Sequence, residues 1–312
     1  MRKLILLILA TLLLAACGGN TAEQPQATQV SLPTRTPRAT QTLLPQKTSR
    51  ATITVPPSLT PVPSVTAIGI NDPRPIKISF QTPDGVTLRG YFYPAAQKNA
   101  PVVVMMHQNE GDQSLWDLEN SGFLTWLQNW PPNDSSLPTP SADGTLPVLN
   151  PILTFNVMTF DFRGHGESDG ERSADFSIYL TDARAAYQAA RSLPNVDPGR
   201  IVGIGTSIGA DAVINACENG CRGAFAISPG NWLGVDYSQS TAKLLEQGKP
   251  VRCMYAVNDG PSPAICWSIE PNEYYKIFAY PGIKHGMTFF VPRKMEADFG
   301  KNIIEFLFEA TR

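Results

Sequence analysis

The sequence predicts an α/β fold in which helices cover both faces of a mostly parallel, twisted sheet of eight strands. Three observations lead to this prediction. Residues 76–80 and 86–93 flank a turn-forming Pro-Asp-Gly and form a predicted antiparallel hairpin. After the hairpin, short apolar runs typical of strands buried on both faces alternate with helical stretches. One run, residues 200–205, continues through a glycine-flanked serine into a helical segment. This alternation is typical of parallel sheets with crossover helices.

The other predicted elements follow in chain order. The strands are 101–107, 155–162, 200–205, 223–228, 251–257 and 275–280, and the helices are 114–128, 177–193, 209–217 and 296–311. Residues 130–151 are rich in Pro, Ser and Asp and are predicted to be a loop, either overhanging a site or making a plain surface excursion. In such a fold, functional groups gather at the carboxyl ends of the strands.

The first 68 residues differ from the rest of the chain. Arg2 and Lys3 precede a short apolar run that ends in Leu-Ala-Ala-Cys17, so residues 1–16 are predicted to be an export signal. The tetrad resembles the bacterial lipoprotein processing box, which implies that Cys17 becomes the lipid-modified first residue. An ordinary secretory signal is the alternative. Residues 17–68 are rich in Thr, Pro, Ser and Gln and are predicted to be a disordered tether between a membrane and a folded domain, residues 69–312.

The charge of the domain argues against one class of partner. The chain holds 25 basic and 27 acidic residues, and residues 1–68 contain six of the basic and one of the acidic ones, which leaves a net charge of −7 from residue 69 onward. A mildly acidic domain without a basic cluster is not expected to bind nucleic acid.

Four cysteines remain for the domain once Cys17 is assigned to the lipid. An even number in an exported protein favours two disulfides, and proximity in sequence favours the pairs Cys217–Cys221 and Cys253–Cys266. Zinc binding is the alternative, but the spacing matches no standard ligand pattern and no His lies nearby in sequence.

The serine that follows residues 200–205 stands in Gly205-Thr206-Ser207-Ile208-Gly209. A turn tight enough to push a serine out over a sheet edge brings backbone segments close together, and flanking glycines remove the side chains that would collide. The following helix directs free N–H groups and its positive dipole end toward an oxyanion.

This strand, serine turn and helix resemble the nucleophile elbow of the α/β-hydrolase superfamily, in which the acid and then the histidine follow the serine. Of the chain's three histidines only His285 follows Ser207, directly after the last predicted strand. Asp259, in an Asn-Asp-Gly after residues 251–257, is the expected acid, with Glu270 and Asp236 as alternatives. The resemblance covers about residues 73–312 and implies a Ser-His-Asp triad.

Two further segments carry the resemblance. Residues 101–111 match the strand and loop that give the second oxyanion N–H in this superfamily, but Gln108 stands where Gly is usual, so either Gln108 or Asn109 is expected to donate beside Ile208. His107 is expected to be structural. Residues 161–170 resemble the Asp-x-Arg-Gly-x-Gly loop and are expected to shape the backbone, with His165 available to line the pocket.

The triad implies a serine hydrolase that cleaves a small-molecule carboxylic ester without a metal or organic cofactor. The segments between the triad residues are too short for a large cap domain. In this respect the sequence resembles the dienelactone hydrolase-like branch of the superfamily. Trp232, Tyr237 and Trp116 are candidate pocket walls, with core packing as the alternative. A serine peptidase of the same fold and an inactive, surface-tethered binding protein are the alternative functions.

Overall fold

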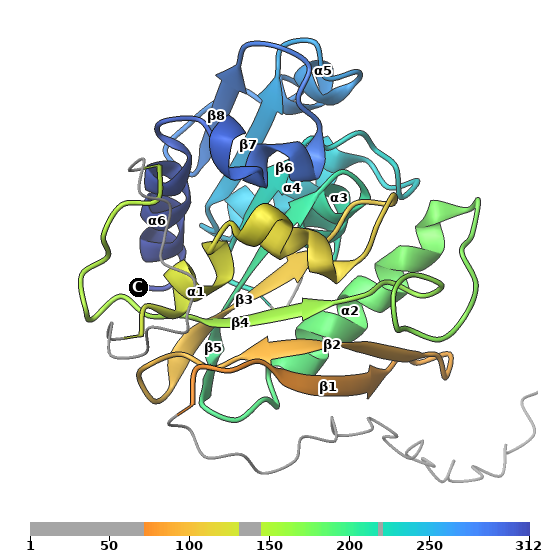
Figure 1. Ribbon diagram of the computed structural model, residues 1–312. Helices are drawn as coiled ribbons and strands as arrows, with labels where there is room; N and C mark the ends of the chain where they lie inside the picture. The colour runs from red at the N-terminus through yellow and green to blue at the C-terminus, as the bar shows by residue number, and fades with distance from the viewer. Residues whose placement is uncertain (1–71, 131–144, 218–220) are drawn as a thin grey trace, which may run out of the picture. The chain divides into compact units, whose positions relative to one another are not determined.

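A computed structural model describes residues 72–130, 145–217 and 221–312 (Figure 1). Its centre is one eight-stranded sheet with the order β1-β2-β4-β3-β5-β6-β7-β8. The strands are β1 (Ile76–Gln81), β2 (Thr87–Tyr93), β3 (Ala100–Met106), β4 (Asn156–Phe160), β5 (Val196–Thr206), β6 (Ala224–Ile227), β7 (Val251–Ala256) and β8 (Tyr275–Tyr280). All eight predicted strands are therefore present.

The sheet is parallel except at one edge. Strand β2 runs antiparallel to both of its neighbours, β1 and β4, whereas every pair from β4 through β3 to β8 is parallel. Within the hairpin, the Thr82 carbonyl accepts from Gly85 N–H at 2.9 Å, and Gly85 has a φ of +87°. The carboxyl ends of β3, β5, β6, β7 and β8 consequently meet at one edge of the sheet.

Helices cover both faces. The α-helices are α1 (Phe123–Gln128), α2 (Tyr179–Ala190), α3 (Ile208–Asn215), α4 (Tyr237–Glu246), α5 (Ser262–Cys266) and α6 (Phe299–Ala310), and the 3₁₀ helices are η1 (Gln113–Asn120), η2 (Phe176–Ile178), η3 (Gly286–Phe290) and η4 (Pro292–Lys294). One buried cluster packs α2, α3 and α4 on the sheet, and the other packs η1, α1 and α6. Strand β3 serves both clusters, since Val104 belongs to the first and Val103 to the second.

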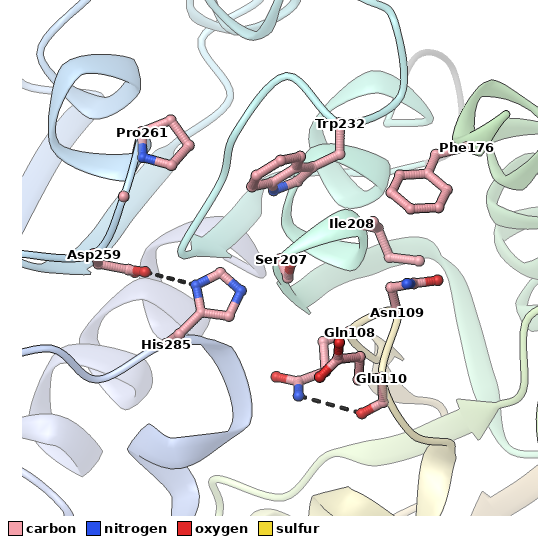
Figure 2. Close-up of a pocket in the computed structure, with 11 residues that line it drawn as sticks. Gln108, Asn109, Glu110, Phe176, Ser207, Ile208, Trp232, Asp259, Pro261 and His285 are labelled. Atoms are coloured by element: carbon pink, nitrogen blue, oxygen red, sulfur yellow. Dashed lines mark hydrogen bonds and ion pairs between the residues drawn. The ribbon is translucent and has the colours of Figure 1, made fainter. Parts of the chain in front are cut away.

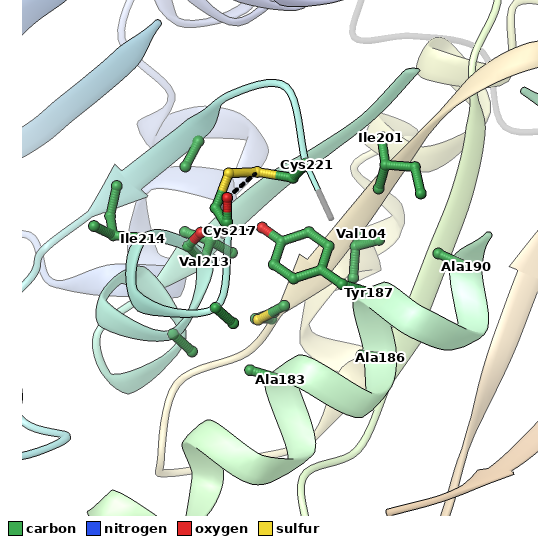
Figure 3. Packing of buried hydrophobic residues seen from close by; sticks show 14 of the residues in the cluster. Val104, Ala183, Ala186, Tyr187, Ala190, Ile201, Val213, Ile214, Cys217 and Cys221 are labelled. Carbon is green, nitrogen blue, oxygen red and sulfur yellow. Dashed lines mark hydrogen bonds between the residues drawn. A yellow bond between two sulfur atoms is a disulfide. The ribbon is translucent and has the colours of Figure 1, made fainter. Parts of the chain in front are cut away.

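Figure 3 shows how closely α2 and α3 pack. The buried Tyr187 hydroxyl of α2 donates to the Val213 carbonyl of α3 at 3.1 Å. A Cβ on Gly203 of β5 would lie 2.0 Å from that hydroxyl oxygen, so the strand must have glycine there. The contact fixes the position of the helix that starts at the predicted nucleophile.

One predicted helix is wrong, and two α-helices of the structure, α4 and α5, were not predicted. The stretch predicted as one helix over 114–128 is broken, because Asp117 to Glu119 have non-helical dihedral angles and a second helix starts after Gly122, whose φ is +67°. Helix α4 was not predicted, although its N-cap is visible in the sequence. Asp236 accepts a hydrogen bond from Gln239 N–H at 3.0 Å, as N-cap residues do.

The predicted signal, the tether and Cys17 lie outside the described residues, as does most of the predicted loop 130–151. The described ends of that loop are anchored to the domain: Trp130 Nε1 donates to the Pro94 carbonyl at 2.8 Å, and Thr145 O accepts from Gly300 N–H at 3.1 Å. Among the described helices, none has the length and apolar character needed to span a bilayer.

Both predicted disulfides are present. Cys217 is bonded to Cys221 at the end of α3, with Cα atoms 4.9 Å apart (Figure 3). Cys253 of β7 is bonded to Cys266 of α5, with Cα atoms 5.7 Å apart. Because these bonds occupy all four sulfurs, the alternative of a zinc site made from them is wrong.

Candidate active site

Ser207 lies between β5 and α3 in a conformation that its glycine neighbours make possible. Its φ is +54° and its ψ is −117°, a strained combination for a residue with a side chain. A Cβ at Gly205 would lie 2.0 Å from the Gly209 carbonyl oxygen, and a Cβ at Gly209 would lie 2.0 Å from the Met106 carbonyl oxygen. The turn therefore packs directly on the end of β3, and both glycines are required by contact.

His285 and Asp259 meet at the same edge of the sheet, after β8 and β7. His285 Nδ1 lies 2.6 Å from Asp259 Oδ1, and the Asp259 side chain is only 5% exposed. Figure 2 shows the other ring nitrogen of His285 on the side that faces Ser207. A proton on Nδ1, donated to Asp259, leaves Nε2 as the acceptor. The alternative acids lie elsewhere: Asp236 caps α4, and Glu270 is exposed.

These three side chains line one cavity of about 430 Å³. The residues around it are Gln108, Asn109, Glu110, Phe176, Ser207, Ile208, Trp232, Asp259, Gly260, Pro261 and His285 (Figure 2). The structure thus brings together all six residues that the sequence nominated for the triad and the oxyanion contacts. Ile208 N–H, at the start of α3, has no hydrogen-bond acceptor among the described residues and can bind an anion, whereas Ala210 N–H already donates to the Ser207 carbonyl at 2.9 Å.

The backbone around His285 is held by neighbouring loops. His285 N–H donates to Thr288 Oγ1 at 2.9 Å, and the next N–H, from Gly286, donates to the buried Ser228 Oγ at 2.9 Å. Met287 N–H donates to Gln108 Oε1, also at 2.9 Å. A Cβ on Gly286 would lie 2.3 Å from that same oxygen. The Gln108 side chain therefore bridges the loop after β3 and the histidine loop.

His107 is structural, as expected. Its Nδ1 lies 2.7 Å from the Gln108 carbonyl and its Nε2 accepts from Phe162 N–H at 3.0 Å, so the ring is neutral with the proton on Nδ1. Complete burial lowers the pKa of His107 to about 3. The ring ties the loop after β3 to the loop after β4.

The loop 161–170 supports the same region from behind. His165 does not line the cavity; its Nε2 lies 2.9 Å from the Asn109 carbonyl, and its Nδ1 lies 3.0 Å from the Arg163 carbonyl. Asp161 Oδ1 accepts from Gln113 N–H at 2.7 Å. Arg163 is buried and paired with Asp182 of α2. The expectation that this loop shapes the backbone therefore agrees with its contacts.

The walls of the cavity differ in part from the prediction. Of the three aromatic candidates Trp232 lines it, but Tyr237 and Trp116 are fully buried in the core, where Trp116 packs against Phe290. Sequence reasoning did not nominate Phe176 or Glu110. Glu110 lies in the same loop as Gln108 and could have been found there, but Phe176 reaches the cavity from η2, which no motif marks.

The charged side chains that line the cavity in the described part of the chain are acidic. Glu110 and Asp259 are the carboxylates, and no Lys or Arg is among the lining residues of the described chain. Phe176, Ile208 and Trp232 form an apolar side next to Ser207 (Figure 2). The cavity therefore suits a substrate with an apolar group and no negative charge near the reacting bond.

The chain is similar to several known proteins. The family model described as Serine aminopeptidase, S33, matches residues 153–256, about a third of the chain, which include Ser207 and end three residues before Asp259. The uncharacterised protein YfhR of Escherichia coli K12 is 28% identical over 150 residues, which are 46% of this chain and 42% of that protein. Uncharacterised protein Rv2307c of Mycobacterium tuberculosis is 28% identical over 249 residues, covering 72% of this chain and 76% of that one.

A solved structure shows the same fold. The Pyrococcus furiosus esterase Pf2001 superposes with a TM-score of 0.54 at 17% identity, over 80% of this chain and 98% of that one. The strand order, the serine turn after β5 and the likeness to this solved structure lead to one conclusion: the chain has the α/β-hydrolase fold.

Proposed function

We propose that the protein is a serine hydrolase that cleaves small, uncharged carboxylic esters through an acyl-enzyme. The observation that carries the proposal is the 2.6 Å contact between His285 Nδ1 and Asp259 Oδ1, in a cavity that the strained Ser207 also lines. A strained serine, an oriented histidine and a buried carboxylate at the carboxyl ends of β5, β8 and β7 form the arrangement that acyl transfer requires.

In the proposed mechanism Ser207 Oγ attacks the ester carbonyl carbon while His285 Nε2 takes the hydroxyl proton. Asp259 holds the imidazole in the required tautomer and stabilises the imidazolium. The oxyanion accepts hydrogen bonds from Ile208 N–H and from the N–H of Gln108 or Asn109. His285 then returns the proton to the leaving alkoxide, and a water molecule activated by the same ring releases the acid. These residues supply every proton transfer.

The lining supports the choice of an uncharged ester. A free carboxylate on the substrate would enter a wall that holds Glu110 and Asp259 and no basic side chain among the described residues. We also propose that the protein has the compact arrangement of the dienelactone hydrolase-like branch. Only α4 lies between β6 and β7 in the chain, and only the short α5 lies between β7 and β8.

An aminopeptidase is the second candidate, and one observation favours it. The matching family model is described as a serine aminopeptidase, and Glu110 offers a carboxylate in the cavity to which a substrate's free α-ammonium could bind. If so, Glu110→Gln raises KM for alanyl-p-nitroanilide and leaves KM for p-nitrophenyl butyrate unchanged. Equal effects on both substrates would remove Glu110 from that role.

We further propose that the enzyme acts outside the cytoplasm, attached to a membrane through a lipid on Cys17. The signal-like residues 1–16 support this, and the two disulfides suit an oxidising compartment. Metabolic labelling with a radioactive fatty acid should mark the wild-type protein and not Cys17→Ala. Equal labelling of both would contradict the attachment site.

The reaction class is tested by kinetics on a panel of p-nitrophenyl esters and amino-acid p-nitroanilides, together with a fluorophosphonate probe. An esterase turns over the esters and is labelled at Ser207. A binding protein of this fold does neither. Turnover of the anilides with little turnover of the esters would favour the aminopeptidase.

A further inference from the structure

A second buried carboxylate lies on the helix that Ser207 starts. Asp211, one turn further along α3, is 0% exposed and pairs with no basic side chain among the described residues. Its partners are instead backbone groups of the loop after β6: Oδ1 accepts from Gly230 N–H at 3.2 Å, and Oδ2 accepts from Trp232 N–H. A single side chain of α3 therefore holds the loop that carries Trp232.

Both oxygens of Asp211 are needed as acceptors for this arrangement. Burial disfavours the ionised carboxylate and raises the pKa of Asp211 to about 7. The backbone N–H groups from Gly230 to Leu233 act in the opposite direction and favour the ionised form. An asparagine would put an amide N–H₂ against one of these backbone donors, so it could satisfy only one side of the loop.

The position of the Trp232 ring depends on its backbone. The ring lies directly against Gly230, since a Cβ there would be 2.2 Å from Trp232 Cε2. The buried indole N–H has no acceptor among the described residues, so no hydrogen bond from the ring fixes its place. Yet Trp232 forms part of the cavity wall beside Ser207 and Ile208 (Figure 2).

Resting on the esterase function proposed above, we propose that Asp211 is a positioning residue that sets acyl selectivity by holding Trp232 in the cavity wall. Asp211 lies on α3, the helix that starts at Ser207. Because Asp211 also holds the backbone of Trp232, the distance between the Trp232 ring and Ser207 stays fixed. The acyl group that fits that spacing reacts fastest, and a displaced Trp232 changes which acyl group fits.

The test compares kcat/KM for p-nitrophenyl benzoate and p-nitrophenyl acetate. Asp211→Asn is expected to change this ratio about tenfold, in the same direction as Trp232→Ala. Gly230→Ala, which pushes the ring away while Asp211 stays intact, should change it in the same direction too. Asp236→Asn is the matched control, because asparagine caps a helix as well as aspartate, and its ratio should equal that of wild type.

A double variant separates positioning from general damage. In the Trp232→Ala background, Asp211→Asn should alter the ratio by less than about twofold, because the group through which it acts is gone. Independent, additive effects would overturn the proposal. If Asp211→Asn does not fold, hydrogen exchange of the wild-type protein decides: protected amides at Gly230 and Trp232 support the proposal, and exchange at the rate of a free loop overturns it.

The proposed function can fail without the inference failing. Labelling of Ser207 by a small alkyl and a bulky aryl fluorophosphonate needs no ester turnover. A labelling ratio that shifts in Asp211→Asn, in a protein that hydrolyses no ester of the panel, would support Asp211 and reject the esterase. An unshifted labelling ratio in a folded variant would overturn the role of Asp211.

Discussion

The side-chain oxygen of Gln108 accepts a hydrogen bond from the backbone N–H of Met287 at 2.9 Å, which ties the loop after β3 to the loop that carries His285. The α/β-hydrolase superfamily, which the sequence resembles, usually has glycine at the position of Gln108, and such a glycine could not make this contact. Gln108 therefore makes a contact between the two loops that glycine could not make. The Gln108 side-chain oxygen also lies so close to Gly286 that a Cβ there would be 2.3 Å from it, so the two loops pack tightly against each other.

Replacing Gln108 by alanine should lower kcat on p-nitrophenyl acetate about 10- to 100-fold, because the loop that carries His285 loses one support and the imidazole shifts relative to Ser207. KM should change much less. Gln97→Ala is the control, since the Gln97 side chain also makes a hydrogen bond to a loop backbone, by donating to the Pro151 carbonyl, and does not line the cavity. Unchanged kcat in Gln108→Ala would show that the other contacts of the histidine loop suffice.

Asp259→Asn should lower kcat/KM by roughly 10³- to 10⁴-fold while leaving the melting temperature near that of wild type. The amide cannot accept the Nδ1 proton with the same preference, so the imidazole presents the wrong tautomer to Ser207. The comparison variant is Asp236→Asn, in which an exposed N-cap changes in the same way. A similar loss in both variants would argue against a specific role for Asp259.

Acid should destabilise the protein in part through His107. The pKa of this ring is about 3 in the folded state, below its ordinary value of 6.5, because burial disfavours the imidazolium. Its contribution is therefore fully present above about pH 6.5 and is lost as pH falls toward 3. His107→Gln does not titrate and its amide oxygen can still accept from Phe162 N–H. Urea unfolding at pH 7.5, 5.5 and 4 should show a steeper decline for wild type than for this variant; parallel declines would contradict the account.

The two disulfides should differ in their effect on activity. Serine at Cys217 and Cys221 is expected to lower the free energy of unfolding by about 2 kcal/mol, and serine at Cys253 and Cys266 by about 3 kcal/mol, since the second pair closes a longer loop. Only the second pair encloses Asp259. Its loss should therefore also lower kcat, measured well below the melting temperature. Equal activity in both double variants would show that β7 alone positions the acid.

The inner strands were predictable because burial on both faces gives each an apolar run of its own, and the hairpin was predictable from its Pro-Asp-Gly turn. The candidate site was predictable because strand ends are marked by Gly205, Asp259 and His285 in a fixed order. The missing parts have weaker signals. Helix α4 depends on the cap at Asp236, and the break at Asp117 to Glu119 depends on tertiary packing of η1 and α1. Phe176 reaches the site through the fold, and Asp211, although it lies one turn of α3 from Ser207, contacts a loop that follows β6. No local pattern marks either contact.

The central claim is that Ser207 is a nucleophile, and the most direct measurement is p-nitrophenyl acetate hydrolysis by wild type beside Ser207→Ala. We expect turnover by the wild-type protein and a loss of about a thousandfold or more in a variant that folds normally. Turnover that survives the substitution would contradict the account, because hydrolysis would then proceed without the group on which the whole site converges.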